Sequence, residues 1–181
     1  IDKLYGSYEE KFAQARLLYL YMMTHPGKKL NFMGNELAMF REWDERREPD
    51  WDLLNMPAHD AFHRYILELI KIYFENPALY TDDYGVDGFE WLDCHSEEKC
   101  VYAFRRRSQK QTLLAVFNFS DKAVDYKLGL DDISSLELLI DSNEPRFGGE
   151  YGETALPKIK DGTASFSLTA FSGQVYVMNN D

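Results

Sequence analysis

The spacing of hydrophobic residues changes near Tyr80, and this change limits the possible folds more than any other feature of the sequence. Before it, apolar side chains recur every three or four residues, as on one face of a helix. Ser7 and Glu10 have the spacing of a capping box and precede a mostly apolar segment, so we predict a helix over residues 8–23. A second helix is predicted to begin at Pro57, because proline suits the first helical position.

Beyond Tyr80 the sequence alternates between apolar and polar residues in short runs rich in β-branched and aromatic side chains. Turns containing Ser, Asp, Lys and Gly separate these runs, which is typical of an antiparallel sandwich. The change of pattern divides the chain into two parts, residues 1–82 and residues 83–181. The predicted strands lie in the segments CVYAFRRR, TLLAVFNFS, AVDYKLGL, LELLID, TASFSL and GQVYVMN.

Residues 28–34, which read KKLNFMG, predict one short strand that enters a turn at Gly34. A single strand leaves its backbone N–H and C=O groups without partners in its own part of the chain. With a helix on each side, this unit is expected to be the last helix–strand–helix slice of a (β/α)8 barrel. The predicted fold class is therefore α+β, with the barrel slice followed by an antiparallel all-β sandwich.

Charge and composition exclude several classes of partner. The net charge of −11 at pH 7 disfavours binding to nucleic acid or to an anionic membrane surface. No apolar run approaches the ~20 residues that span a bilayer, and no secretory signal pattern is present. We therefore expect a soluble, cytoplasmic protein with no nucleic-acid or membrane partner. Because the sequence begins at Ile1 and not at Met, we expect a piece of a longer protein.

The two cysteines are too few for a disulfide framework. A hairpin between Cys94 and Cys100 would bring their sulfur atoms together. We favour the other interpretation, in which both stay free thiols in a reducing cytosol.

Residues 31–54 are the main candidate for a functional site, because they combine many carboxylates with large aromatic side chains. In a barrel the active site forms at the carboxyl ends of the strands, so Glu36, which follows the predicted strand, is the best-placed carboxylate. Trp43 and Trp51 either wedge the loop onto the barrel or offer flat faces to sugar rings. The other acids of the loop are expected to be solvated and paired with nearby arginines.

Other chemically interesting residues favour structural explanations. His59 and His63 have the i, i+4 spacing of a metal pair, with Asp60 nearby. The sequence offers no third ligand and no HExxH motif, so we expect no metal and no cofactor. His25 is expected to cap the first helix. The basic run at residues 105–107 is expected to be ordinary charge on a strand.

Several motifs give the sequence a specific resemblance. The passage HPGKKLNFMGNE is followed by REW and then by DW, and GFEWLDC opens the predicted sandwich. In this combination the chain resembles the carboxyl-terminal part of bacterial 1,4-α-glucan branching enzymes of the α-amylase superfamily. The resemblance runs from Ile1 through Phe119 and continues weakly to the last strand.

The resemblance implies the seventh helix, the eighth strand and the eighth helix of the barrel, followed by the all-β domain. It also implies a retaining glycosyltransferase of glycogen biosynthesis, which cuts an α-1,4 glucan, holds the segment covalently on an Asp and passes it to a 6-hydroxyl as an α-1,6 branch. The implied partners are α-1,4 glucan or glycogen and the rest of the catalytic barrel. The catalytic trio of the family would lie upstream of Ile1, so no catalytic residue is expected in this chain, and the chain alone is expected to be inactive.

Residues 34–39 depart from the family pattern, which reads Gly-Gly-Glu-Phe-Gly-Gln at this place. Glu36 is kept, whereas the neighbouring glycine and glutamine positions are replaced, so the detailed sugar contacts around residues 35–39 stay open. Two alternatives stay open. One is a non-catalytic glucan-binding or structural β-sandwich module of another amylase-superfamily protein. The other is a related amylase or trehalose-forming hydrolase, against which GFEWLDC argues.

Overall fold

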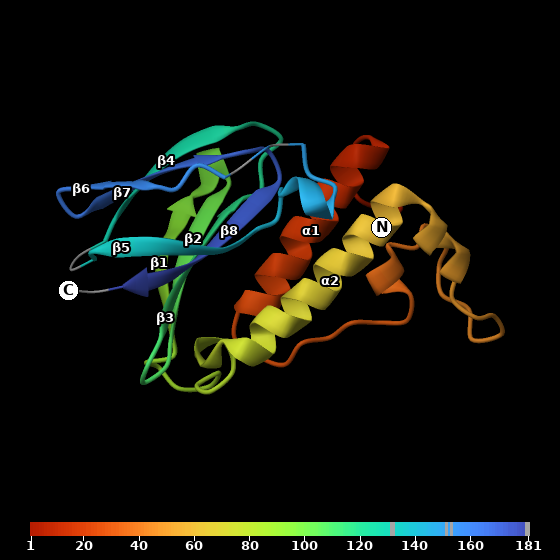
Figure 1. Cartoon of the computed structure of the whole chain (residues 1–181), viewed down its shortest axis with the longest axis horizontal. Coiled ribbons are helices and arrows are strands. Elements are labelled where there is room, and N and C mark those ends of the chain that lie inside the picture. Colours follow the sequence, from red (N-terminus) through yellow and green to blue (C-terminus); the bar gives the residue numbers. More distant parts are fainter. Residues whose placement is uncertain (131–132, 151, 153, 180–181) are drawn as a thin grey trace.

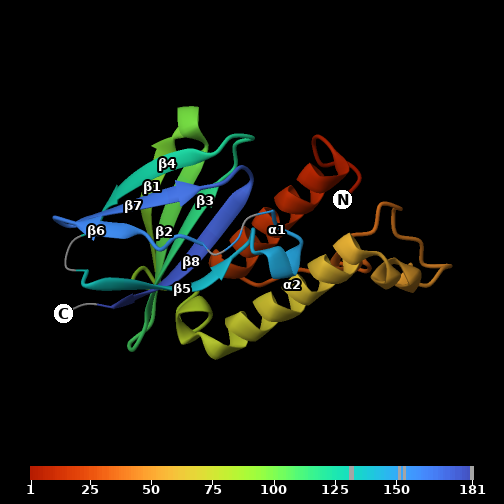
Figure 2. The same ribbon diagram turned by 45° about the horizontal axis from the view of Figure 1, so that its top comes forward.

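The computed structural model describes residues 1–130, 133–150, 152 and 154–179, and these residues form three layers (Figure 1). Two helices form the first layer, a five-stranded sheet the second and a three-stranded sheet the third. Figure 2 shows both helices on the same side of the two sheets after rotation. The predicted α+β class, with helices followed by an antiparallel all-β domain, is confirmed.

Both predicted helices are present. α1 spans Tyr8–Thr24, and α2 spans Pro57–Glu75. The capping box forms as predicted, because the Glu10 N–H donates to the Ser7 hydroxyl and the Ser7 N–H donates to the Glu10 carboxylate. His25 caps the other end of α1, where its N–H donates to the Tyr21 carbonyl at 2.8 Å. The two helices lie side by side and run in the same direction (Figures 1 and 2).

The predicted strand at residues 28–34 is wrong. Residues 28–32 have no regular secondary structure, and every strand in the described part of the chain lies beyond residue 88. A strand needs a hydrogen-bonded neighbour, and no strand among the described residues pairs with this segment. It leads instead to Gly34, whose φ of 79° is left-handed, and to the 3-10 helix η1 (Asn35–Leu37). A further 3-10 helix, η2 (Trp51–Asn55), precedes α2.

All six predicted strands are present, and neighbouring strands are antiparallel in both sheets. The five-stranded sheet has the order β1-β2-β3-β8-β5, and the three-stranded sheet has the order β4-β7-β6. The strands are β1 (Phe89–Ser96), β2 (Val101–Arg107), β3 (Thr112–Asn118), β4 (Val124–Gly129), β5 (Ser135–Asp141), β6 (Lys158–Lys160), β7 (Thr163–Leu168) and β8 (Ser172–Asn179). Short 3-10 helices connect them or precede them: η3 (Pro77–Leu79), η4 (Glu97–Lys99) and η5 (Pro145–Phe147).

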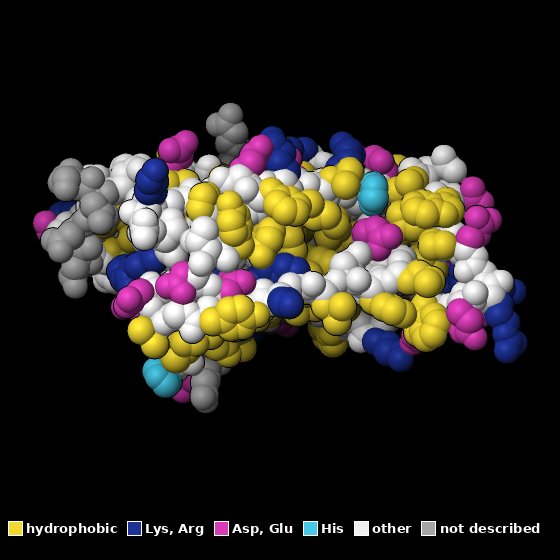
Figure 3. Space-filling model, turned by 90° about the horizontal axis from the view of Figure 1, so that it is seen from below, with side chains coloured by type: hydrophobic (Ala, Val, Ile, Leu, Met, Phe, Trp, Pro, Cys, Tyr) yellow, Lys and Arg dark blue, Asp and Glu magenta, His cyan; other side chains and the backbone are white. Residues whose placement is uncertain are grey.

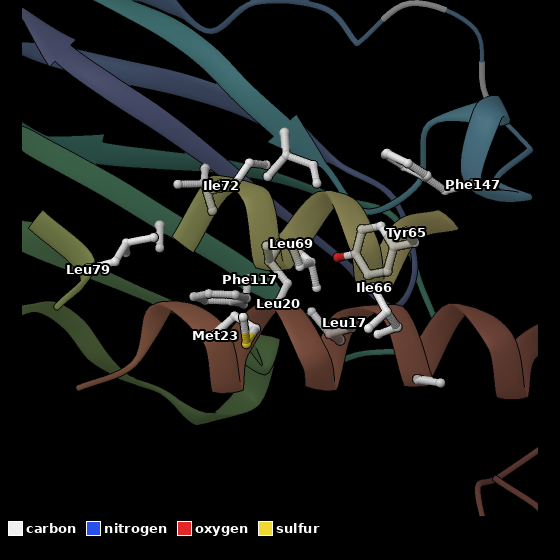
Figure 4. Packing of buried hydrophobic residues seen from close by; sticks show 14 of the residues in the cluster. Leu17, Leu20, Met23, Tyr65, Ile66, Leu69, Ile72, Leu79, Phe117 and Phe147 are labelled. Atoms are coloured by element: carbon white, nitrogen blue, oxygen red, sulfur yellow. The ribbon is translucent and has the colours of Figure 1, made fainter. Parts of the chain in front are cut away.

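Two hydrophobic cores lie on opposite faces of the five-stranded sheet. β3 shows this clearly, because Leu113, Ala115 and Phe117 belong to the core under the helices, whereas Leu114 and Val116 belong to the core between the sheets. Figure 4 shows apolar side chains of α1 and α2 pointing toward one another beside Phe117. The helices and the sandwich thus share a core, and the division at residues 82 and 83 stays a prediction.

The prediction that residues 105–107 carry ordinary strand charge is wrong for Arg106 of β2, because its side chain is only 1% exposed. The guanidinium donates to the carbonyl oxygens of Thr24 at 2.7 Å, Leu79 at 3.1 Å and Gly88 at 3.2 Å. It also pairs with the Asp83 carboxylate at 2.6 Å. The planar fork of donors on arginine suits several fixed acceptors at once. Arg106 therefore ties α1, η3 and the segment before β1 to the sheet.

In the described part of the chain, no disulfide joins Cys94 to Cys100. Each side chain is partly buried. Among the described residues, no helix has the length and apolar character needed to cross a membrane.

Candidate functional site

The turn that carries Glu36, residues 34–38, is fixed by its own backbone. The N–H of Leu37 donates to the Gly34 carbonyl at 3.1 Å, and the N–H of Ala38 donates to the Asn35 carbonyl at 3.0 Å. Ala38 adopts a left-handed φ of 53°, a conformation that costs a non-glycine residue about 1–3 kcal/mol and persists only where the surroundings hold it. Leu37 and Ala38 are fully buried, whereas Glu36 is half-buried. The turn is thus anchored on one side and presents Glu36 on the other.

The Glu36 carboxylate lies in a short chain of hydrogen bonds. It accepts one from the side-chain amide of Asn31 at 2.9 Å, and the Asn31 side-chain oxygen accepts one from the Tyr19 hydroxyl at 2.6 Å. Burial raises the pKa of Tyr19 to about 12, so this hydroxyl keeps its proton at neutral pH. Helix α1, the segment before Gly34 and η1 therefore meet at one polar network. The remaining lone pairs of such a fixed carboxylate can accept hydrogen bonds from the hydroxyls of a sugar.

Trp43 lies near this network. Its side chain is 49% exposed and stands edge-to-face against Phe32, with ring centroids 5.3 Å apart. Both rings line a surface cavity of about 410 Å³ together with Tyr19, Asn35 and Arg41. An open cavity with exposed aromatic rings and a few fixed polar groups is typical of a site for a small polar molecule such as a sugar.

Trp51 is not brought into this group. It is the first residue of η2 and is 50% exposed. Within the described ranges no aromatic ring packs against it, and no hydrogen bond or ring contact joins it to Glu36 or Trp43. Of the three residues predicted for substrate binding, Glu36 and Trp43 share a neighbour, because Tyr19 belongs to the Glu36 network and also lines the cavity beside Trp43. Trp51 is not part of this group. The binding role of all three stays a prediction.

The charged residues of the outer loop pair as expected. Arg41 binds Asp50 at 2.8 Å, and Arg47 lies 4.0 Å from Asp44. The hydrogen bond from Arg41 lowers the pKa of Asp50. These side chains are partly or largely exposed, so the pairs order the loop only modestly.

His59 and His63 have a role that the sequence analysis missed. The Nδ1 atom of His59 lies 2.7 Å from the Leu37 carbonyl oxygen, and that of His63 lies 3.3 Å from the Glu36 carbonyl oxygen. The i, i+4 spacing that suggested a metal pair is the signal that places both rings on one face of α2. In the part of the chain that the structure describes, no group of three metal-binding side chains is present. Both histidines support the turn of the candidate site.

Comparison with known proteins locates the chain in a family. Residues 91–179 match the family model for the α-amylase C-terminal all-β domain. The chain is 43% identical over 152 residues to the 1,4-α-glucan branching enzymes GlgB of Oceanobacillus iheyensis and Geobacillus stearothermophilus. Each alignment covers 82% of this chain but 24% of the relative. The chain therefore spans about a quarter of the length of these relatives.

Solved structures show the same fold at lower identity. A debranching enzyme from Nostoc punctiforme superposes with a TM-score of 0.66 at 19% identity, covering 91% of this chain and 31% of the other. An α-amylase from Anoxybacillus gives 0.63 at 20% identity, covering 93% of this chain and 33% of the other. At this identity the likeness concerns the fold alone. Together the sequence and family matches show that the chain belongs to the α-amylase family and corresponds to the carboxyl-terminal region of the bacterial 1,4-α-glucan branching enzymes.

Proposed function

We propose that this chain is the carboxyl-terminal part of a 1,4-α-glucan branching enzyme, which cuts α-1,4 glucan chains and rejoins them as α-1,6 branches. The observation that carries the proposal is the 43% identity to branching enzymes over 82% of the chain. In this proposal the acids that perform the covalent chemistry belong to other parts of the enzyme. The chain contributes a wall of the active site and the sandwich that supports it.

The geometry around Glu36 supports this division of roles. Retaining glycosyl transfer needs a nucleophile and an acid/base carboxyl group about 5–5.5 Å apart. Glu36 instead has an amide of Asn31 as its nearest partner, at 2.9 Å, and its turn is fixed by buried backbone. A rigid carboxylate of this kind suits binding and orientation of sugar hydroxyls. We therefore propose Glu36 and Trp43 as glucan contacts, with Trp51 as a weaker third.

The exposed apolar surface of the helical layer supports the proposed barrel partner. Large apolar side chains are 41–77% exposed on α1, on α2 and in the segment before Gly34. Figure 3 shows that hydrophobic side chains gather over the helical half of the molecule in this view. The large apolar side chains with these exposures include Leu18, Leu30, Phe32, Met33, Leu67, Ile70 and Phe74. Exposed patches of this kind mark surfaces that other protein covers, and the rest of a catalytic barrel is the partner we propose.

The proposal can be tested with a hybrid enzyme, in which this chain replaces the matching region of a relative. The corresponding region of the Oceanobacillus iheyensis branching enzyme would be replaced by this chain, and the hybrid would be incubated with amylose beside the 181-residue chain alone. Loss of the blue iodine complex and the appearance of α-1,6 linkages by proton NMR report branching. We expect activity from the hybrid and none from the chain alone, because a covalent glycosyl intermediate needs a nucleophile that we place elsewhere.

Two results would contradict the proposal. A hybrid that is folded by circular dichroism but inactive, beside an active relative, would show that the chain does not serve this reaction. Branching or hydrolysis by the chain alone, in proportion to its concentration, would show that it contains its own nucleophile.

A further inference from the structure

Two backbone carbonyls of the Glu36 turn, residues 34–38, have partners on a different element, helix α2. The Leu37 carbonyl faces His59 at 2.7 Å, and the Glu36 carbonyl faces His63 at 3.3 Å. A carbonyl oxygen can only accept, so each histidine must carry a proton on Nδ1 and donate it. Two consecutive carbonyls of one short turn are therefore held by two side chains one helical turn apart on α2.

The His59 ring has little freedom to move. It is 2% exposed and stands edge-to-face against Phe12, with ring centroids 5.0 Å apart and an interplanar angle of 89°. The rings of Tyr8 and Phe40 lie at 6.1 and 6.0 Å from it. A buried donor locked by aromatic rings fixes the position of its acceptor, because losing the bond would leave the buried Leu37 carbonyl unpaired.

The turn has a local reason to need such support. Its two ends, Gly34 and Ala38, are both left-handed, and the conformation at Ala38 is unfavourable for a residue with a Cβ atom. Between them lies the only carboxylate of the turn, and the carbonyl held by His63 belongs to the same residue, Glu36. Support at this carbonyl fixes the Cα position of Glu36 and so limits where its carboxylate can lie.

We infer that His59 and His63 are positioning residues, which hold the Glu36 turn so that the Glu36 carboxylate stays aimed at the glucan site. This inference rests on the proposed function for the role of Glu36 and on the observed contacts for the support itself. The two histidines act through the backbone of the turn, and neither is assigned a contact with substrate.

The support can be measured in the 181-residue chain by hydrogen exchange of the Leu37 and Ala38 amides, which are hydrogen-bonded within the turn. His59→Leu and His63→Leu remove the Nδ1 donor, whereas the matched His→Asn variants keep a donor near that position. Lys71→Leu, on an exposed position of the same helix, is the control. We expect each leucine variant to speed exchange of these two amides about tenfold while β3 amides keep their rates, the asparagine variants to recover part of the protection, and the control to change nothing.

The second measurement is a double-mutant cycle in the active hybrid with the Oceanobacillus iheyensis enzyme. If His63 acts through Glu36, His63→Leu lowers kcat/KM about tenfold when Glu36 is present and less than about twofold in the Glu36→Gln background. Equal losses in both backgrounds would overturn the inference.

In the exchange experiment, unchanged rates or equal acceleration across β3 would overturn it as well. An inactive hybrid would contradict the proposed function alone, because the exchange measurement needs no activity.

Discussion

Arg106 donates a hydrogen bond to the carbonyl oxygen of Thr24 at 2.7 Å, which joins the second strand of the sheet to the last residue of α1. This contact spans 82 positions of sequence and is fully buried. It connects the helical layer to the sandwich by a polar interaction in addition to the shared apolar core.

Replacing Arg106 by Met should destabilise the chain by about 3–5 kcal/mol, because it leaves the Asp83 carboxylate and three carbonyl oxygens without their partner. The half-exposed Arg107, which pairs with Glu90, provides the control, and Arg107→Gln should cost less than about 1 kcal/mol. Urea unfolding followed by circular dichroism gives both values. Similar midpoints for the two variants would show that Arg106 does not hold the layers together.

Gly173→Ala should destabilise the chain by about 1–3 kcal/mol through overpacking. A Cβ atom there would lie 2.8 Å from Phe117 and 3.0 Å from Leu20, and both of these side chains are fully buried. Gly129→Ala is the matched control, since a Cβ atom at this other strand glycine would meet no atom within 4 Å. Its free energy of unfolding should change by less than about 0.5 kcal/mol. A harmless Gly173→Ala would mean that α1 can move away from the sheet at no cost.

Lys29 should make the stability of the chain rise with pH in the alkaline range. Burial lowers the pKa of its ammonium group from 10.5 to about 8 in the folded chain. Between these two values the unfolded chain binds more protons at this position than the folded chain, so the free energy of unfolding increases as pH rises. Unfolding in urea from pH 7 to 10 should therefore show a steeper rise for the wild type than for Lys29→Met. Parallel curves for the two proteins would exclude the shift.

Glu36→Gln should lower kcat/KM of the active hybrid with the Oceanobacillus iheyensis enzyme by about tenfold to a hundredfold, or roughly 1–3 kcal/mol. The substitution keeps the shape of the side chain but removes its charge. Glu48→Gln, farther along the same loop, should change kcat/KM less than about twofold. Steady-state branching rates decide between them. Full activity of Glu36→Gln with unchanged thermal stability would remove Glu36 from the list of glucan contacts.

Local patterns predicted the elements that depend on local forces. The capping box at Ser7 and Glu10 and the alternation in β4 and β7 are visible in the sequence and are present in the structure. β1 is not visible in this way, since its pairing with β2 shifts register between Trp91 and Asp93, which breaks the alternation. β6 is only three residues long. The sequence patterns therefore fail where a strand is irregular or short.

Long-range polar contacts explain the other differences. The burial of Arg106 depends on Thr24, Leu79 and Gly88, which no local pattern connects to it. The same holds at the candidate site. The sequence predicted Glu36 at a turn and indicated that His59 and His63 share one helix face. It could not predict the contacts of the histidines with the carbonyls of the turn, because 22 and 27 residues separate the partners.

The apolar character of both faces of β3 has a consequence for how this strand finds its alignment. In a strand with one polar face, a shift by one residue would expose the apolar side chains, and this penalty fixes the alignment. β3 has no polar face, so the penalty is weak. Asn118 at its end supplies the missing constraint, because its fully buried side-chain amide donates to the carbonyls of Lys122 and Thr169, each at 2.7 Å. A shift would carry this amide away from both acceptors. The hydrogen bonds of Asn118 therefore fix the alignment of β3, as the alternation of polar and apolar residues fixes the alignment of a half-exposed strand.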